Sequence, residues 1–445
     1  MTSQAHITDV RVVREATIKY ALEDQKYRFI STTMIDTNSP QGTASRAAAL
    51  DSMQSFVPRM GRHYTNWRNY DRGPNQHRDV SMLSPYIRRR LITEKEVIAA
   101  ALQEHGPKNA EKFIQEVFWR CYFKGWLERR PQIWTAYVNG LNADLLDLAE
   151  NPAMREKVQA AECGTTGLEC FDGWSQELVN TGYLHNHARM WFASIWIFTF
   201  GLPWRLGADF FFRYLLDGDP ASNTCSWRWV AGLHTRGKTY EAQAWNISKF
   251  TEDRFSPCTS DLQTDLQSLE YQEPHGLPDV MPLRSVTQPD WTVPTAIILT
   301  EDDCSLEDVD FATDNICAAA KLTTSHLRSP RDVSEAVATF EAAALCDAAR
   351  RLKVKQNVET LRADVPTNVV NWVASTGARQ VVMPYVPTGP LDDWMTETRF
   401  LLQQRGIEIA EHRRDWDALV WPHATAGFFK VKKKIPEILY KSGLL

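Results

Sequence analysis

The sequence has no C-x-x-C pair among its eight cysteines, which stand at positions 121, 163, 170, 225, 258, 304, 317 and 346. This scattered spacing argues against a zinc site and against a simple iron–sulfur ligand set, so we expect no metal centre. Nothing at the start of the sequence resembles a secretory signal, and reduced thiols are therefore expected in place of a disulfide framework. These features predict a cytoplasmic protein.

Long hydrophobic runs are also missing. The longest stretch without a charged residue lies between Arg189 and Arg205 and is interrupted by Gly201 and Pro203. Because a membrane-spanning helix needs about 20 apolar residues, we expect no membrane segment. The net charge is only −5. It gives no overall attraction to nucleic acid, so any DNA-binding surface must be local.

Tryptophan, by contrast, is abundant, with 16 residues in a chain of 445. Indole is large, apolar and oxidisable, so it suits protein cores and aromatic binding sites alike. A chain of this length is long enough for two or three domains, each with its own core. The tryptophans can therefore serve packing, binding or both.

The first half of the chain has a helical pattern. From Arg46 to Trp245 apolar residues recur at helical spacing, as in "TEKEVIAAALQEH", "AEKFIQEVFWRCYFKGWL" and "GADFFFRYLLDG". Thr93 with Glu96 predicts a capping box at the start of one helix. We therefore expect an all-helical domain over residues 41–250, after an extension over residues 1–40.

The last third has a different pattern. Residues 251–291 are rich in proline and polar residues and predict a linker. Beyond them the short β-rich runs "TAIILT", "RQVVMPYV", "IEIAEH" and "ALVW" alternate with helical stretches, which predicts a doubly wound parallel sheet over residues 292–445. No G-x-G-x-x-G follows the first run, so the usual dinucleotide site is not expected there. The predicted fold is a helical domain followed by an α/β domain.

Several polar groups of the helical part stand among aromatic residues, but each is a weak signal alone. The stretch Asp217-Gly218-Asp219 favours a turn or a helix cap over a cation site. His185 and His187 are two residues apart, do not share a helical face and make a poor metal pair. Glu116 and Arg120, one helical turn apart, would usually form a surface salt bridge. Their aromatic neighbours favour burial and a functional role.

Taken together, four segments that follow the family's order along the chain resemble the FAD-binding domain of the cryptochrome/photolyase family, closest to the cyclobutane-dimer photolyases. "TGYLHNHARM" resembles T-G-[YW]-x-H-N-x-x-R-M, and "DGDPASNTCSWRW" resembles D-G-D-x-x-x-N-x-x-x-W-x-W. "SMLSPYI" resembles a phosphate-cradling loop, and "EVFWRCYF" resembles the family's E-x-x-W-R-x-[YF] helix. The resemblance runs from about Arg46 to Phe250, and the phosphate loop departs from the family pattern at Val80 and Met82.

The resemblance implies non-covalently bound FAD in a helical bowl, and no motif identifies a second, antenna chromophore. Tyr64 and the phosphate loop would contact the pyrophosphate and ribitol. Asp217 and Asp219 would bind the flavin and ribose side, and Asn223 would face flavin N5. The residues implied are Tyr64, Val80, Ser81, Met82, Leu83, Ser84, Phe113, Arg120, Arg189, Asp217, Gly218, Asp219 and Asn223.

The resemblance also implies a chain of tryptophans that passes electrons to the excited flavin. Trp227 and Trp204 match its inner and middle members. Trp134 is the candidate for the outer member, with core packing as the alternative reading.

The substrate side follows from the same resemblance. A pocket for a flipped-out pyrimidine dimer would be formed by Glu116, Trp119, Asn186, Met190 and Trp229. Contacts to DNA are expected from Trp119 and from Arg68, His187 and Lys249. The stretch Arg88–Arg90 also flanks the proposed pocket and is a further candidate for phosphate contacts.

The function implied is light-driven repair of cyclobutane pyrimidine dimers in DNA by a monomeric lyase whose partner is UV-damaged DNA. The alternatives are a cryptochrome-type blue-light receptor with a signalling protein as partner, a (6-4) repair enzyme and a non-photochemical flavoprotein. Family members normally carry the α/β domain before the helical domain. Because "FFKVKKKIPEIL" resembles the stretch that closes that domain, the order here implies a circular permutation.

Overall fold

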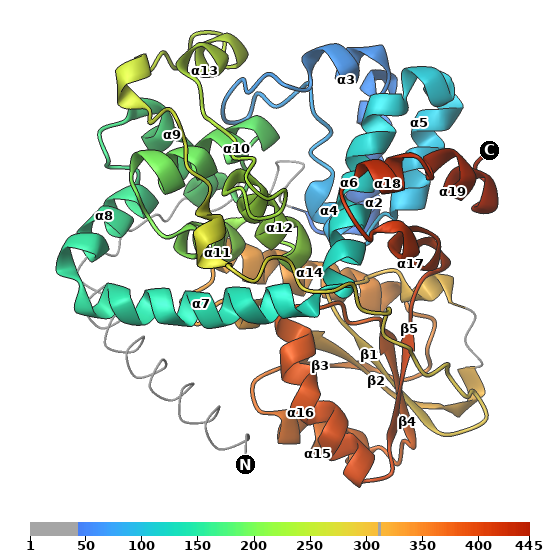
Figure 1. Cartoon of the computed structure of the whole chain (residues 1–445). Helices are drawn as coiled ribbons and strands as arrows, with labels where there is room; N and C mark the ends of the chain where they lie inside the picture. The colour runs from blue at the N-terminus through green and yellow to red at the C-terminus, as the bar shows by residue number, and fades with distance from the viewer. Residues whose placement is uncertain (1–42, 310–312) are drawn as a thin grey trace.

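The computed structural model describes residues 43–309 and 313–445, and the extension expected over residues 1–40 lies outside the described residues. Helices come first along the chain and a five-stranded parallel sheet follows them (Figure 1). The predicted combination of a helical part and a parallel α/β part is confirmed. Every helix in the described residues is too short or too polar to traverse a lipid bilayer.

The helical part wraps its helices around a core rich in tryptophan and phenylalanine. The predicted capping box is confirmed, since the Thr93 side chain accepts from Glu96 N and the Glu96 carboxylate accepts from Thr93 N. The helices are α2 (Arg46–Phe56), α3 (Arg62–Trp67), α4 (Ser84–Arg88), α5 (Glu94–Asn109), α6 (Glu111–Glu128), α7 (Pro131–Glu150), α8 (Pro152–Cys163), α9 (Glu169–Thr181), α10 (Asn186–Ser194), α11 (Trp204–Tyr214), α12 (Pro220–Val230) and α13 (Ala244–Phe250).

The sheet has the strand order β3-β2-β1-β4-β5, and all its strands run parallel. The order changes direction between β1 and β4, which in open α/β sheets marks the switch point of the chain. The strands are β1 (Thr295–Leu299), β2 (Ile316–Thr323), β3 (Val358–Arg362), β4 (Gln380–Pro384) and β5 (Glu408–His412). The helices around the sheet and after it are α14 (Glu335–Arg351), α15 (Pro366–Ser375), α16 (Pro390–Gln404), α17 (Asp415–Val420), α18 (Phe429–Lys432) and α19 (Ile435–Lys441).

For one of the four β-rich runs, the prediction of a strand is wrong. "ALVW", residues 418–421, ends α17 and enters a short 3-10 turn. Val420 and Trp421 are buried against the helical core, and Trp421 packs against Gly125 of α6. Burial against a helix, not pairing with a strand, explains the apolar run, because four apolar residues alone do not distinguish the two structures.

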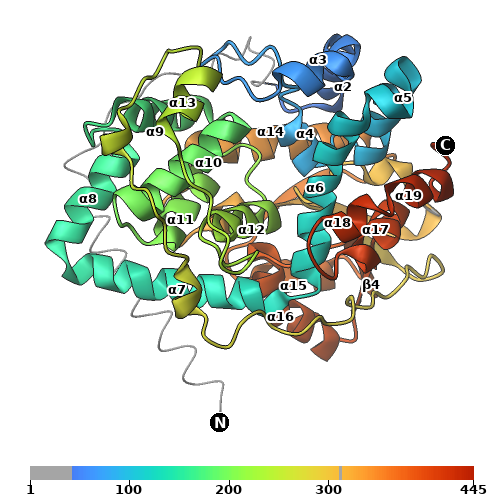
Figure 2. The ribbon, with the colours of Figure 1, turned by 45° about the horizontal axis from the view of Figure 1, so that its top comes forward.

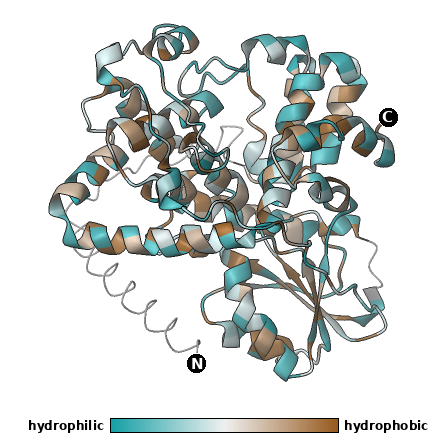
Figure 3. Ribbon diagram, viewed as in Figure 1, coloured by the Kyte–Doolittle hydropathy of each residue, from teal (hydrophilic) through white to brown (hydrophobic). Residues whose placement is uncertain are grey.

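The central strands are buried on both faces. Ala296 and Ile298 of β1 point into a core shared with α15 and α16, whereas Ile297 and Leu299 point into the core of the helical part. Successive residues of a strand face opposite sides, so β1 joins the two cores. Figure 3 shows these strands mostly in the brown of apolar residues.

Buried ion pairs hold the helical part to the loop after β1. Arg88 lies 3.3 Å from Glu301 and 3.1 Å from Asp302, and Arg89 lies 2.9 Å from Glu301. Arg90 pairs with Asp303 at 3.3 Å. The prediction that Arg88–Arg90 contacts DNA phosphates is therefore wrong for the structure described.

The physical reason is burial: the three arginines are 0% to 5% exposed. Charges taken out of water must be paired, and these three are paired across the boundary between the two parts of the chain. Arg88–Arg90 thus connects the helical part to the α/β part through buried ion pairs.

The predicted linker, residues 251–291, runs over the surface of both parts with two short 3-10 turns (Figure 2). Leu269 N donates to Ala231 O, and Met281 N donates to Arg129 O at 2.8 Å. Farther along, Glu411 N of β5 donates to Thr287 O at 3.2 Å. The segment is thus tied down by backbone hydrogen bonds along its course.

Candidate functional site

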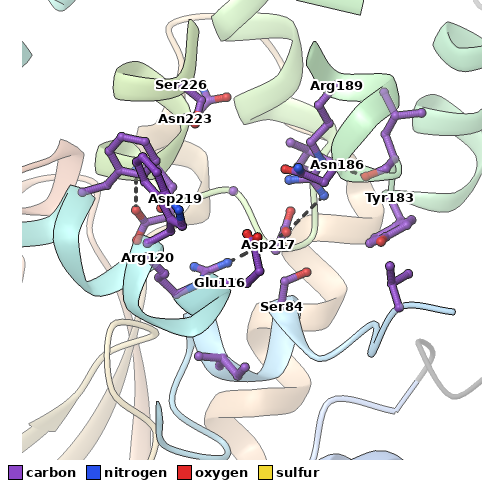
Figure 4. A pocket seen from close by; sticks show the side chains of 18 of the residues that line it. Ser84, Glu116, Arg120, Tyr183, Asn186, Arg189, Asp217, Asp219, Asn223 and Ser226 are labelled. Carbon is purple, nitrogen blue, oxygen red and sulfur yellow. Dashed lines mark hydrogen bonds and ion pairs between the residues drawn. The ribbon is translucent and has the colours of Figure 1, made fainter. Parts of the chain in front are cut away.

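One cavity of about 460 Å³ opens in the helical part, between the loop before α4, helices α6, α10 and α12, and the loop that joins α11 to α12 (Figure 4). This volume is in the range of small-molecule sites, about 300–1,000 Å³. Every residue predicted to hold the cofactor lines the cavity, as do every predicted substrate residue and Trp227. The tertiary structure brings segments together that lie more than a hundred residues apart.

The loop before α4, residues 80–84, forms one side of the cavity. Met82 has a φ of 54°. This left-handed conformation costs a residue other than glycine about 1–2 kcal/mol. Ser81 Oγ accepts from Leu83 N at 3.4 Å, and Ser84 hydrogen-bonds Asp217. The loop is thus bent sharply and presents two hydroxyl groups at the cavity wall.

Asp217 is the centre of the charged side of the cavity. Its Oδ2 accepts from Arg189 Nη2 at 3.1 Å and lies 3.9 Å from Arg120 Nη2. Burial by itself would raise the pKa of Asp217, but the two guanidinium groups outweigh it and hold the pKa below its ordinary value. The carboxylate is therefore ionised and orients both arginines.

Asp219 caps α12, as expected for this stretch. Its Oδ1 accepts from Ser222 N at 2.8 Å, and its Oδ2 lies 3.7 Å from Lys124 Nζ. Burial raises its pKa, but the charges of Lys124, Arg120 and Arg88 outweigh burial and lower the pKa to about 2. One turn into α12, Asn223 Nδ2 donates to Ala208 O at 2.8 Å, which leaves Oδ1 for the cavity.

Several polar atoms of the wall are buried without a hydrogen-bond partner among the described residues. They are Arg120 Nη1, Asp217 Oδ1, Ser222 Oγ and Trp227 Nε1. Because buried polar atoms are nearly always hydrogen-bonded, this set suits a ligand with many polar groups.

The predicted substrate residues lie on the open side of the cavity. Glu116 is 41% exposed and 3.8 Å from Arg68 Nε, yet the protein around its carboxyl raises its pKa. Asn186 Nδ2 lies 3.8 Å from Met190 Sδ. The indoles of Trp119 and Trp229 line the same cavity. Apolar walls with a hydrogen-bonding edge are thus available beside the charged side.

The two histidines of α10 have separate structural roles. His185 is fully buried and caps the helix, since its Nδ1 accepts from His187 N at 3.2 Å. Its other nitrogen binds Arg68 O at 3.1 Å, and burial lowers its pKa, so the ring is neutral. His187 packs against Trp191 and Phe250. Neither histidine lines the cavity.

The residues predicted for DNA contacts lie beside the cavity. Arg68 forms an ion pair with Glu116, which lines the cavity. Lys249 is exposed, and its ammonium lies over the ring of Phe250. Since His187 packs on the same Phe250 ring, His187 and Lys249 lie close together on one surface.

Behind the cavity, aromatic rings form a path to the α/β part. A β-carbon at Gly207 would lie 2.3 Å from the Trp227 ring, so Trp227 packs directly on α11, one turn from Trp204. Tyr137 of α7 lies 5.8 Å from Trp204 and 5.3 Å from Trp134, between ring centroids. Trp204, Tyr137 and Trp134 thus form a series of neighbouring rings, and Trp227 packs on the helix that carries Trp204. Tyr137 is a member that the sequence did not indicate.

The sequence also missed part of the cavity wall. Tyr183 stands inside the "TGYLHNHARM" motif. The guanidinium carbon of Arg189 lies over its ring, 5.5 Å from the ring centroid. Ser222 and Ser226 stand inside the "DGDPASNTCSWRW" motif. Helical spacing from Asn223 could have indicated the serine at i+3, whereas nothing in the sequence indicates Phe123 or Phe211, which also line the wall.

Three possible ligand atoms for a metal gather outside the cavity, on Asp71, His77 and Glu177. Asp71 Oδ2 already accepts from Arg254 and from Trp174, and His77 Nε2 is 2.7 Å from Glu177 Oε1. These hydrogen bonds account for the cluster as a buried polar network.

Comparison with known proteins identifies one region of the chain. Residues 113–265 match the FAD binding domain of DNA photolyase. This part of the chain belongs to the photolyase/cryptochrome family. The match begins inside the predicted helical domain and extends into the predicted linker.

Individual proteins are similar to this chain over part of its length. The deoxyribodipyrimidine photo-lyase of Streptomyces griseus is 32% identical over 157 residues, which are 35% of this chain and 33% of that protein. The deoxyribodipyrimidine photo-lyase of Agrobacterium fabrum is 30% identical over 193 residues, 43% of this chain and 39% of that protein. The chain thus spans little more than a third of the length of these relatives. A solved bacterial class III photolyase from Agrobacterium tumefaciens aligns with 47% of this chain and 43% of that chain, at 22% identity and a TM-score of 0.34.

The cofactor of this photolyase-type domain is FAD. The cavity wall fits it: the unpartnered atoms of Arg120, Asp217 and Ser222 suit a polar ligand, and the serines of the loop before α4 are hydrogen-bonding groups for phosphate. The apolar side chains of the same wall, such as Phe113 and Trp227, suit an aromatic ring system.

Proposed function

We propose that this protein is a flavin photoenzyme that repairs cyclobutane pyrimidine dimers in DNA. The observation that carries the proposal is the single cavity in which the cofactor residues and the five substrate residues meet. A flavoprotein without this substrate would need the first set but not the second. The relatives named above as deoxyribodipyrimidine photo-lyases support the same reaction.

Reduced FAD, held by the residues of the cavity wall, would supply light-driven one-electron chemistry to the dimer with no net redox change. The chain's residues bind and orient the dimer beside it. Glu116 has a raised pKa. It can therefore accept a hydrogen bond from a base N–H and, when protonated, donate one to a carbonyl.

The aromatic side chains would hold the flipped-out bases. Trp119 and Trp229 offer flat apolar faces on which unstacked bases pack, a contact worth about 1–3 kcal/mol per base. Both indoles are fixed from outside the cavity, Trp119 by Phe428 and Trp229 by Tyr240. Fixed rings lose little freedom on binding, which favours affinity.

The DNA strand around the dimer would bind to the surface of Arg68, His187 and Lys249. Arg68 and Lys249 supply positive charge near the cavity. Burial lowers the pKa of His187 to about 4, so this ring is neutral at physiological pH and contributes packing and hydrogen bonding, not charge. The overall charge of −5 makes such a local surface necessary.

A blue-light receptor is the second candidate. The observation that favours it is the aromatic path from Trp227 to Trp134, which leads away from the substrate side of the cavity and reaches the α/β part. Such a path serves reduction of the flavin by light, which a receptor requires and repair by reduced flavin does not.

We further infer that the sheet domain over residues 292–445 corresponds to the α/β domain that precedes the helical domain in other family members, so that the chain is circularly permuted. Its parallel sheet shares a core with the helices and is held to them by the Arg88–Arg90 ion pairs. In a rearranged chain, residues 292–445 come first and a flexible linker joins them to residue 43. This chain should fold and bind FAD. An insoluble or FAD-free product, from a chain whose linker length has been varied, would count against the inference.

The test of the proposed function is light-dependent loss of cyclobutane dimers from UV-irradiated oligothymidine. The purified protein is loaded with FAD, chemically reduced, and compared in light and darkness. Repair in light only would support the enzyme, and Glu116→Gln should slow it without loss of FAD. The control Glu111→Gln, at an exposed position of the same helix, should repair at the native rate.

Other outcomes separate the rivals. Photoreduction without repair would favour the receptor. Repair of (6-4) products but not of cyclobutane dimers would favour the (6-4) enzyme. Protein that holds FAD but shows neither photoreduction nor repair would favour a non-photochemical flavoprotein.

A further inference from the structure

The aromatic path ends on a carboxylate of the α/β part. Trp134 Nε1 of α7 donates to Asp393 Oδ2 of α16 at 2.8 Å. Trp134 is 3% exposed, whereas Asp393 is an exposed residue. Figure 1 shows the beginning of α7 beside α16, where the two parts of the chain meet. The hydrogen bond therefore connects a buried indole to a group that reaches solvent.

The other polar atoms along this path differ from Trp134 Nε1. Trp227 Nε1, Trp204 Nε1 and Tyr137 Oη are all buried and have no hydrogen-bond partner in the described part of the chain. An oxidised ring can lose its proton only to a base within hydrogen-bond reach. Among these four rings, the described structure provides such a base to Trp134.

We propose that Asp393 is the proton acceptor for oxidised Trp134, so that light-driven electron transfer ends in a proton transfer between the two parts of the chain. The proposal rests on the proposed photochemical function, with photo-excited flavin as the oxidant. An electron leaves Trp134 for the oxidised Trp204, and the N–H proton of Trp134 passes to the Asp393 carboxylate. A neutral indolyl radical and a carboxylic acid result, and the bound flavin would be the acceptor of the electron.

This step gives the separated charges a longer lifetime. An indole that has lost an electron is a much stronger acid at N–H than the neutral ring, so transfer to a carboxylate is downhill. Return of the electron then requires return of the proton, which slows recombination. Tyr137 lies between the two tryptophans but cannot hold the positive charge, because its hydroxyl has no acceptor for the proton among residues 43–309 and 313–445.

The charges around the pair are few. Asp392 precedes Asp393 on α16 and pairs with Arg399 at 2.7 Å, and Glu128 at the end of α6 accepts from Thr388 N. The residues of α7 between Trp134 and Tyr137 carry no charge. Although Asp393 is an exposed residue, the protein packed around its carboxyl raises the pKa to about 6, and Asp392 adds to the rise. The carboxylate is thus available as an acceptor above about pH 6 and is lost below it.

The first test needs no cofactor. In protein with ¹⁵N-labelled indoles, the N–H resonance of Trp134 is assigned as the signal that Trp134→Phe removes. It should shift with pH as Asp393 titrates, and Asp393→Asn should abolish that shift. A Trp134 resonance that keeps the same titration in Asp393→Asn would overturn the hydrogen bond on which the proposal depends.

The second test uses the FAD-loaded protein at pH 8 and transient absorption. The native protein should form the neutral tryptophan radical with a rate that falls in D₂O. Asp393→Asn keeps the shape of the side chain but cannot take a proton. In this variant the tryptophan radical should remain a protonated cation. The lifetime of the charge-separated state should fall about tenfold, which corresponds to about 1.4 kcal/mol in the barrier to recombination. The control Asp392→Asn should behave as the native protein.

The outcomes separate this proposal from the proposed function. If Trp227→Phe suppresses photoreduction while Asp393→Asn changes neither lifetime nor isotope effect, Asp393 is not the acceptor and the electron route stands. If Trp227→Phe leaves photoreduction intact, the route itself is wrong and the role of Asp393 is wrong with it.

Discussion

The rings of Trp119 and Phe428 stack with their centroids 4.0 Å apart and an angle of 14° between their planes. Trp119 belongs to α6 and lines the cavity, whereas Phe428 comes just before α18, near the end of the α/β part. One wall of the proposed substrate pocket is therefore supported by a segment that follows it by more than three hundred residues.

Phe428→Ala should weaken binding of a dimer-containing oligonucleotide by about 2- to 10-fold, because a stacked aromatic pair contributes about 0.5–1.5 kcal/mol beyond its buried area. Binding is measured by fluorescence anisotropy with the FAD-loaded protein, and FAD content should not change. The control is Phe429→Ala, since Phe429 is 73% exposed. Equal weakening in both variants would mean that Phe428 does not act through Trp119.

Trp227→Phe should suppress photoreduction of bound FAD and leave the cofactor in place. Phenylalanine keeps most of the volume behind the cavity but is far harder to oxidise than indole. The measurement is the absorption change of the flavin under blue light with an external reductant. Trp245→Phe, at a tryptophan that is 61% exposed, should photoreduce at the native rate.

Asp219→Ala should destabilise the protein by about 3–5 kcal/mol, because it leaves the buried ammonium of Lys124 unpaired and removes the cap of α12. The pKa of Asp219 is lowered in the folded protein, to about 2. Its contribution is therefore complete above its ordinary pKa near 4 and is lost as the pH falls from about 4 to 2. Urea unfolding of both proteins at pH 7 and at pH 3 checks the sign: the difference should shrink at pH 3.

Glu301→Gln should also destabilise the protein, by about 3–5 kcal/mol, since Glu301 faces the buried guanidinium groups of Arg88, Arg89 and Arg328. Thermal unfolding measures the loss. A variant as stable as the native protein would show that these ion pairs do not hold the two parts together.

Lys249→Ala should act on DNA binding and not on stability. An exposed lysine that contacts a phosphate contributes about one unit to the slope of log K against log salt. The slope for UV-irradiated duplex DNA should therefore fall by about one, with an unchanged melting temperature. Lys157, an exposed lysine on α8, provides the control variant, whose slope should remain native.

Much of the fold could be predicted from local pattern. Periodic apolar residues located α5, α6 and α11, and the runs "TAIILT", "RQVVMPYV" and "IEIAEH" became β1, β4 and β5. The run "ALVW" became part of a helix. Two strands, β2 and β3, were not predicted; β3 lies at the edge of the sheet with polar and exposed residues. Short runs carry too little periodicity to separate strand from helix, and edge strands lack the apolar signal.

The sequence by itself indicated many residues of the cavity wall, because the motifs of the photolyase-type domain follow one another along the chain, but it missed others such as Phe123 and Phe211. Only the tertiary structure decided which charged groups are exposed. The run Arg88–Arg90 has the appearance of a basic surface patch, yet it is buried against Glu301, Asp302 and Asp303. The hydrogen bond between Trp134 and Asp393, which are 259 residues apart, could not be predicted from the sequence either. Local spacing fixes what a helix presents on each face, whereas the partner of that face depends on how distant segments pack.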